Sequence, residues 1–215
     1  MTIAEKAERI YSRLENRADA IIHVIGVLFA INAGLWLLFH VTGLPVVVSV
    51  CVYCVGLFAM LTASAAYNLA PAGTVRDMLR RFDHSAIFIM IAATYTPFAA
   101  NRLGHPYGEV ILAAIWVCAS IGVALKMLFP RRFEMASIAF YVGMGWMILT
   151  VVKPLAASVS LMDFWLLIGG GVVYCAGVAF YLIERIPYHK AIWHGFVLAA
   201  AVLQFAAIAG EFSAV

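Results

Sequence analysis

The sequence predicts an all-α, polytopic membrane protein, built as a bundle of seven transmembrane helices. The composition is the first reason: the 215 residues are 65% hydrophobic and 12% charged, with a mean hydropathy of +0.99. Soluble domains carry about 25% charged residues. The apolar residues also form runs long enough to cross a bilayer, and Lys and Arg concentrate in every second connection. Each run is long enough for a helix to make all of its backbone hydrogen bonds internally. The alternating pattern of barrel strands is absent, so we expect helices.

Seven apolar runs account for most of the chain. A helix needs about 20 mostly apolar residues to cross the hydrocarbon core. The runs cover residues 20–40, 45–69, 84–101, 108–128, 134–152, 163–183 and 191–211. Their connections are too short for a soluble domain. We therefore expect a cytoplasmic juxtamembrane segment over residues 1–19, without the pattern of a signal peptide, and one membrane domain over residues 20–215.

The distribution of positive charge predicts the orientation. Twelve Lys and Arg residues lie in the N-terminal segment and in the second, fourth and sixth connections, whereas the other side carries only Arg102 and Lys153. Positively charged connections stay in the cytoplasm. The N-terminus is therefore predicted to be cytoplasmic and, with seven spans, the C-terminus to be outside.

Polar residues gather where several runs reach the cytoplasmic side. Ser64 and Asn68 end the second run, Asp83 and His84 begin the third, and His194 lies one turn into the last. Glu15, Asp19 and His23 follow one face of the first helix, because each is four residues from the next. This convergence indicates a site, although membrane helices commonly begin and end with polar residues.

Asp83 has two compatible interpretations. It follows the basic stretch with Arg76, Arg80 and Arg81, which we expect to be a loop. As a helix N-cap it would accept backbone N–H bonds and interact favourably with the helix dipole. As an ionisable residue at membrane depth it is a candidate functional group.

Several motifs are spread along the chain. They are Glu15…Asp19…His23-Val-Ile-Gly26, Ser64-x-x-Tyr67, Phe82-Asp83-His84-Ser85, Thr94-Tyr95-Thr96-Pro97-Phe98, Gly143-Met-Gly145-Trp146 and Ile192-Trp193-His194-x-Phe196-Val197-Leu198. Through these motifs the chain resembles the hemolysin III proteins, the bacterial branch of the progestin and adipoQ receptor family. The resemblance covers nearly the whole chain and implies seven spans with a cytoplasmic N-terminus.

The resemblance also implies a cytoplasm-facing zinc site. In the family, a histidine at the end of span two and two histidines four residues apart in span seven hold the ion, beside the span-three aspartate. Here Asn68 and Lys190 stand at two of those histidine positions, and Gln204 replaces a further histidine of many relatives. His194 and Asp83 remain, Asn68 is a poor ligand, and His189 lies about 140° around the helix from His194. The set His194, Asp83, Asn68 and His189 therefore speaks against a tightly held zinc ion.

We hypothesise that Lys190 replaces the missing cation. A carboxylate without a partner is costly to bury, and a Lys side chain can reach inward from a helix start. Lys190 would then pair with Asp83, directly or through water.

Two function classes stay open. Some relatives resemble ceramidase-like amide hydrolases, so the first class is a protein of membrane or lipid homeostasis, catalytic or sensory, with Asp83 and Ser64 as candidate catalytic residues. The second is a pore-forming hemolysin-like protein, which the nearly apolar middle of each run disfavours. We expect a multi-pass protein of the bacterial inner membrane with lipids as partners and without nucleic acid; homo-oligomerisation stays open.

Overall fold

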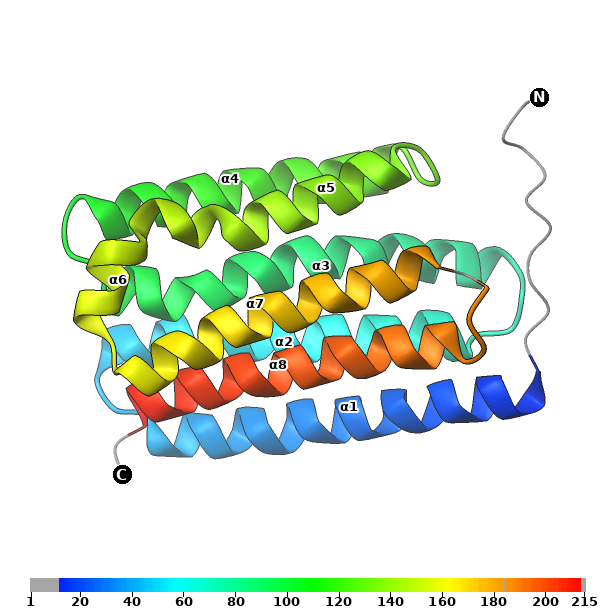
Figure 1. Cartoon of the computed structure of the whole chain (residues 1–215), viewed down its shortest axis with the longest axis horizontal. Coiled ribbons are helices and arrows are strands. Elements are labelled where there is room, and N and C mark those ends of the chain that lie inside the picture. The colour runs from blue at the N-terminus through cyan, green and yellow to red at the C-terminus, as the bar shows by residue number, and fades with distance from the viewer. Residues whose placement is uncertain (1–11, 184, 214–215) are drawn as a thin grey trace.

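The computed structural model describes residues 12–183 and 185–213, and these fold into a bundle of aligned helices (Figure 1). Every apolar run predicted from the sequence is helical. The elements are α1 (Arg13–His40), α2 (Leu44–Leu69), α3 (Thr74–Asn101), α4 (Tyr107–Leu128), α5 (Glu134–Gly145), the 3₁₀ helix η1 (Trp146–Val151), α6 (Val152–Ser158), α7 (Leu161–Leu182) and α8 (His189–Phe212).

The helices pack mostly against their neighbours in sequence, and α1 closes the arrangement by packing against both α2 and α8. Figure 1 shows α4 and α5 on one face of the bundle and α1 on the opposite face. Among the described elements, α5 makes only few contacts with α3, α4 and α7. The loosely packed side of the bundle is therefore the one between α5 and α7.

Six helical segments are long and apolar enough to cross a membrane, within the residues that the structure describes. They are α1, α2, α4, the combined segment Glu134–Ser158, α7 and α8, with a mean hydropathy between 1.8 and 2.4 over their most apolar stretches. Large apolar side chains such as Phe39 and Val55 point out of the bundle. The protein is therefore a polytopic helical membrane protein.

The third predicted span is not among these six. It lies in α3, which has 28 residues but begins ten residues earlier than its apolar run. The seven-span arrangement and its orientation accordingly stay predictions.

The expected loop before the third run is wrong. Residues 76–81 belong to α3, which starts at Thr74 directly after Gly73. No helix-breaking residue separates this charged stretch from the apolar run, so one helix continues through both. Asp83 consequently lies inside α3, where no free backbone N–H groups are available, and the interpretation as an N-cap is wrong as well.

The fifth predicted run is continuous in sequence but interrupted in structure. The hydroxyl of Tyr95 donates toward the carbonyl of Gly145 at 2.8 Å and accepts from the N–H of Ile148 at 2.8 Å. Pro154 further along has no N–H for the helix ladder. Together these groups explain why α5 gives way to η1 and then to α6.

The N-terminal boundary predicted at residue 19/20 lies within α1. Ser12 and Glu15 form a reciprocal capping box, so the helix begins at Arg13 and continues without a break to His40. The rest of the predicted juxtamembrane segment, residues 1–11, lies outside the described residues.

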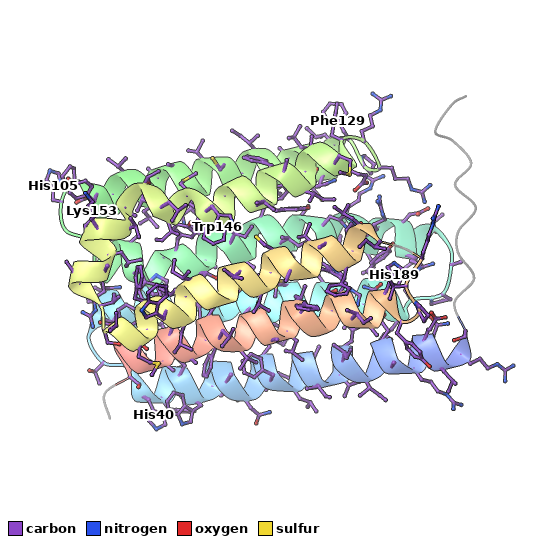
Figure 2. The ribbon with its side chains drawn as sticks, viewed as in Figure 1. His40, His105, Phe129, Trp146, Lys153 and His189 are labelled. Carbon is purple, nitrogen blue, oxygen red and sulfur yellow. The ribbon has the colours of Figure 1, made fainter. Side chains whose placement is uncertain are left out.

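We call one end of the bundle the basic end. It holds the start of α1, the first part of α3, the end of α4 with the α4–α5 connection, and the α7–α8 connection with the start of α8. Figure 2 shows His189 and Phe129 toward this end, whereas His40, His105 and Lys153 lie at the other. Of the described Lys and Arg residues, those in the basic-end segments are Arg13, Arg17, Arg76, Arg80, Arg81, Lys126, Arg131, Arg132, Arg185 and Lys190.

Candidate functional site

A cavity of about 950 Å³ lies inside the bundle, with walls contributed by α1, α2, α3, α5, α7 and α8. Its lining is divided along the helix axes. Charged and polar side chains surround it at the basic end, and Met60, Ile91, Leu167 and Leu198 are among the apolar residues that line the rest. The polar lining residues of the basic end are Asn16, Asp19, His23, Ser64, Asn68, Arg76, Arg80, Asp83, His84, Glu134, His189, Lys190 and His194.

The site residues predicted from the sequence all line this cavity. They are Ser64, Asn68, Asp83, His189, Lys190 and His194. They do not form one cluster of ligand atoms. Within the described chain, the group of His, Asp, Glu and Cys residues close enough to hold a metal is Asp19, His23 and His194, with their ligand atoms within 4.8 Å of one another. Of the predicted ligands, only His194 belongs to it.

Asn68 is engaged within its own helix. Its side-chain amide donates to the backbone carbonyl of Ser64 at 3.0 Å and lies 3.5 Å from the Ser64 hydroxyl. These contacts join the two predicted residues of α2 and hold the amide along the helix.

Asp83 pairs with its neighbour. Nδ1 of His84 lies 3.2 Å from the Asp83 carboxylate and 2.9 Å from the carbonyl of Arg80. An ion pair between Asp83 and Lys190 is not found among the described residues, although both side chains line the same cavity. Within the described part of the chain, Lys190 therefore makes no direct ion pair with Asp83, and their pairing through water stays a prediction.

His189 cannot complete a site with His194. The helix α8 begins at His189, after Tyr188 in a left-handed conformation, so His189 and His194 are five residues apart on a regular helix. Five residues turn the helix by about 500°, which leaves the two side chains about 140° apart. The structure therefore keeps the angular separation that the sequence spacing predicts.

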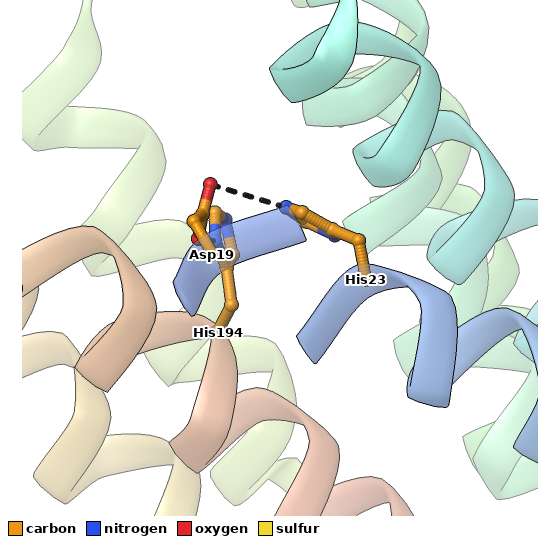
Figure 3. A group of neighbouring side chains, drawn as sticks. All are labelled: Asp19, His23 and His194. Atoms are coloured by element: carbon orange, nitrogen blue, oxygen red, sulfur yellow. Dashed lines mark hydrogen bonds and ion pairs between the residues drawn. The ribbon is translucent and has the colours of Figure 1, made fainter. Parts of the chain in front are cut away.

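Asp19, His23 and His194 form a closely packed cluster between the first and last helices (Figure 3). Nδ1 of His194 lies 2.6 Å from Oδ1 of Asp19, and Nε2 of His23 lies 3.5 Å from Oδ2 of the same carboxylate. The two imidazole rings approach to 4.3 Å between centroids. Asp19 and His23 are 6% and 5% exposed, so both side chains are shielded from the surroundings of the bundle.

Local sequence and a tertiary contact together build the cluster. Asp19 and His23 are four residues apart on α1 and share its inner face. The start of α1 is tied to the start of α8, because the backbone N–H of Tyr188 donates to the Glu15 carboxylate at 2.9 Å. Gly195 of α8 lies beside Ile22 of α1, next to His194. The Asp–His spacing was visible in the sequence, but its position opposite His194 was not.

A second polar cluster lines the cavity on the other side. Nη2 of Arg80 donates to Glu134 at 2.7 Å, and the ammonium of Lys126 lies 3.3 Å from the same carboxylate. The Arg76 guanidinium lies 5.3 Å from the centre of the Tyr67 ring. This side of the cavity therefore presents fixed positive charge, held by α3, α4 and α5.

The zinc site implied by the family resemblance does not fit this chain. The amide of Asn68 is a weak metal ligand, and the ammonium of Lys190 has no lone pair while it is charged. Only His194 remains of the three histidines. Two imidazoles and a carboxylate stand together at a different place, the cluster on α1 and α8.

Comparisons with known proteins agree with the resemblance seen in the motifs. A family model described as "Haemolysin-III related" matches residues 11–205. "Hemolysin-3" of Bacillus cereus is 38% identical over 194 residues, which cover 89% of this chain and 89% of that protein. "Hemolysin-3 homolog" of Bacillus subtilis (strain 168) is 37% identical over 194 residues, covering 89% and 91%.

More distant similarity reaches a human protein. "Monocyte to macrophage differentiation factor" of Homo sapiens is 29% identical over 163 residues, which cover 73% of this chain and 67% of that protein. This match supports the link to the progestin and adipoQ receptor superfamily. No solved structure gives a significant match. With a family model over most of its length and relatives at 37–38% identity, the chain belongs to the haemolysin-III-related family of membrane proteins.

Proposed function

We propose that this protein binds a membrane lipid inside its bundle, with the headgroup at the basic end, and acts in membrane lipid homeostasis. The observation that carries the proposal is the divided cavity of about 950 Å³. Pockets for small ligands span about 300–1,000 Å³ and combine apolar walls with a few polar groups. A volume at the top of that range suits an amphiphile.

The cavity also has the length of an acyl chain. Its lining on α7 extends from Leu167 to Tyr181, and fourteen residues of helix rise by about 21 Å. Gln204 lines the apolar part and His194 the basic end. A lipid would enter directly from the bilayer through the loosely packed side between α5 and α7. Its acyl chain would then not have to pass through water.

The polar end supplies groups for work on a headgroup. Asp83 with His84 offers a carboxylate–imidazole pair that can accept and return a proton, and Ser64 lines the same wall. We propose hydrolysis of an amide or ester linkage of the bound lipid as the activity. The alternative within this class is a sensor that binds the lipid and leaves it intact.

A pore is the second candidate, because two relatives are named Hemolysin-3 and Hemolysin-3 homolog. The packing at the far end of the bundle argues against it. Phe98, Ala207, Ile208 and Phe212 are at most 7% exposed and belong to the apolar core beyond the cavity. A conducting path would have to open this layer.

For the membrane arrangement, we propose α3 as a seventh span, with the N-terminus in the cytoplasm of a bacterial cell and the protein in the cytoplasmic (inner) membrane. The excess of Lys and Arg at the basic end supports this orientation. A periplasmic reporter fused after Val215 should be active, and one inserted at residues 70–73 should be inactive. The reverse result would overturn the orientation.

The lipid proposal is tested on protein purified in a mild detergent, by extracting bound lipid and identifying it by mass spectrometry. Val178 lines the cavity, whereas Val172 on the same helix faces outward and is 52% exposed. Val178→Trp should remove the co-purified lipid, and Val172→Trp should retain it. Equal lipid content in both variants would contradict the proposal.

Hydrolysis is tested on the same protein with an N-acyl amide lipid and an acyl ester lipid in mixed micelles, by measuring release of fatty acid. Asp83→Asn and Ser64→Ala should abolish release while lipid stays bound. Bound lipid with no release in the wild type would leave the sensor, and ion flux through reconstituted liposomes would favour the pore.

A further inference from the structure

We infer that Asp19, His23 and His194 form a binding site for a divalent transition metal, zinc being the ion that suits the donors best. The site would use the first helix in place of the second helix that the family resemblance implies. This inference goes beyond lipid binding and does not depend on it.

The spacing of the ligand atoms is close to what a metal needs. A zinc ion is bound at about 2.0–2.2 Å by imidazole nitrogen and carboxylate oxygen, which sets tetrahedral ligand atoms about 3.4 Å apart. Nε2 of His23 is 3.5 Å from the Asp19 carboxylate, and all three ligand atoms lie within 4.8 Å of one another. Small side-chain adjustments are therefore enough to gather them around one ion.

One buried nitrogen of the cluster, Nε2 of His23, has no hydrogen-bond partner in the described chain. This atom is inaccessible, and its contact with Asp19 is a long ion pair. Buried polar atoms without a partner are rare in folded proteins. A metal ion would use this nitrogen as a ligand and neutralise the buried Asp19 carboxylate at the same time.

The donor set also selects the class of metal. Two imidazoles with one carboxylate are the ligands of many zinc sites and of other first-row divalent metals, whereas calcium and magnesium prefer oxygen ligands only. All three residues line the cavity, so the site is reachable from inside the bundle.

Two substitutions relative to the family pattern fit the same inference. Lys190 brings a positive charge, and Asn68 a weak ligand, to positions where the family places zinc-binding histidines. Both changes disfavour a metal on the α2 side of His194. Asp19 adds a negative charge on the α1 side, where His23 is already one turn away.

The inference is tested by metal analysis of the full-length protein in detergent, after removal of metal with a chelator and dialysis against zinc. The wild type should retain zinc in an amount close to that of the protein. Asp19→Asn, His23→Gln and His194→Gln should each lose at least about tenfold in zinc affinity. Asp83→Asn and Asn68→Ala, which change cavity residues outside the cluster, should retain the wild-type affinity.

A spectroscopic variant guards against loss of binding through misfolding. His23→Cys keeps a metal ligand at the same position, so cobalt added to this variant should produce a thiolate charge-transfer band that the wild type lacks. Absence of zinc from the wild type, unchanged affinity in the Gln variants, or absence of the cobalt band would overturn the site. Lipid content is measured separately on the same preparations, so failure of this site is distinguishable from failure of the lipid proposal.

Discussion

The two polar clusters of the cavity differ in what neutralises their carboxylates. On the α1–α8 side, Asp19 lies between two imidazoles, which keep lone pairs and can exchange protons or metals. On the α3–α5 side, Glu134 is held by Arg80 and Lys126, which are permanent cations. The first cluster has the chemical groups for ligation, whereas the second joins three helices and presents positive charge. One cavity thus combines a wall of metal-ligating groups with a wall of fixed charges.

The largest effect on stability is expected from Glu134→Gln. Lys126 is only 4% exposed and would lose its charged partner together with Arg80. Removing one member of a buried ion pair costs about 3–5 kcal/mol of stability. Because Glu134 is partly exposed, we expect a loss of about 3 kcal/mol, at the lower end of this range. Unfolding in mixed detergent micelles measures the change. Unchanged zinc affinity in this variant would confirm that the two clusters are independent, and unchanged stability would contradict the structural role.

Rebuilding the family site should compensate for loss of the α1 ligand. In a His23→Gln background, Asn68→His with Lys190→His supplies two new imidazoles beside His194. We expect the zinc affinity to be about 100-fold higher than in the His23→Gln variant alone, which corresponds to about 2.8 kcal/mol of binding free energy. Titration with zinc in the presence of a competing chelator measures it. If the affinity does not rise, the α2 side of His194 cannot hold a metal in this chain.

Asp19→Asn should destabilise the metal-free protein by about 2 kcal/mol, because it removes the charge-assisted hydrogen bond between the Asp19 carboxylate and His194. Zinc at about 100 times its dissociation constant should stabilise the wild type by about 2.7 kcal/mol and leave this variant unchanged. Thermal unfolding with and without zinc separates the two contributions. Equal stabilisation of both proteins by zinc would exclude Asp19 as a ligand.

Asp83→Asn should change stability by less than about 1 kcal/mol, since its partner is a neighbouring histidine on the same helix and both side chains remain partly exposed. Release of fatty acid should nevertheless be lost. Asp83→Glu keeps the charge and should retain part of the activity. A fully active Asn variant would remove Asp83 from the proposed chemistry.

The smallest effect is expected from Asp77→Asn. Like the Arg80–Glu134 pair, the Asp77–Arg131 ion pair joins α3 to the chain around the start of α5. The Asp77 carboxylate lies 2.7 Å from Arg131, but the two side chains are 59% and 69% exposed. Exposed pairs contribute about 0.2–1 kcal/mol. The same unfolding measurement serves as the control for Glu134→Gln, and a loss as large as in that variant would contradict the ranking by burial.

Much of the fold could be predicted because hydropathy is a local property. The run at residues 45–69 is helical over Leu44–Leu69, and the run at 108–128 over Tyr107–Leu128. The start of α3 could not be predicted in the same way, because a charged stretch that forms a helix at a membrane surface looks like a loop when judged by hydropathy. The break after Gly145 depends on Tyr95, fifty residues earlier in the sequence.

The sequence by itself determined that this is a helical membrane protein of the haemolysin-III-related family and that His194 belongs to a polar region near Asn68 and Asp83. Composition, run length and motif spacing are sufficient for these conclusions. Only the tertiary structure decided that Asp19 meets His194 across 175 residues. Helices in a membrane are all similarly apolar, so their pairing depends on small residues and complementary shapes at particular contacts. The pairing of helices therefore cannot be predicted from the sequence of a single helix. The candidate metal site exists only where the first and last helices meet.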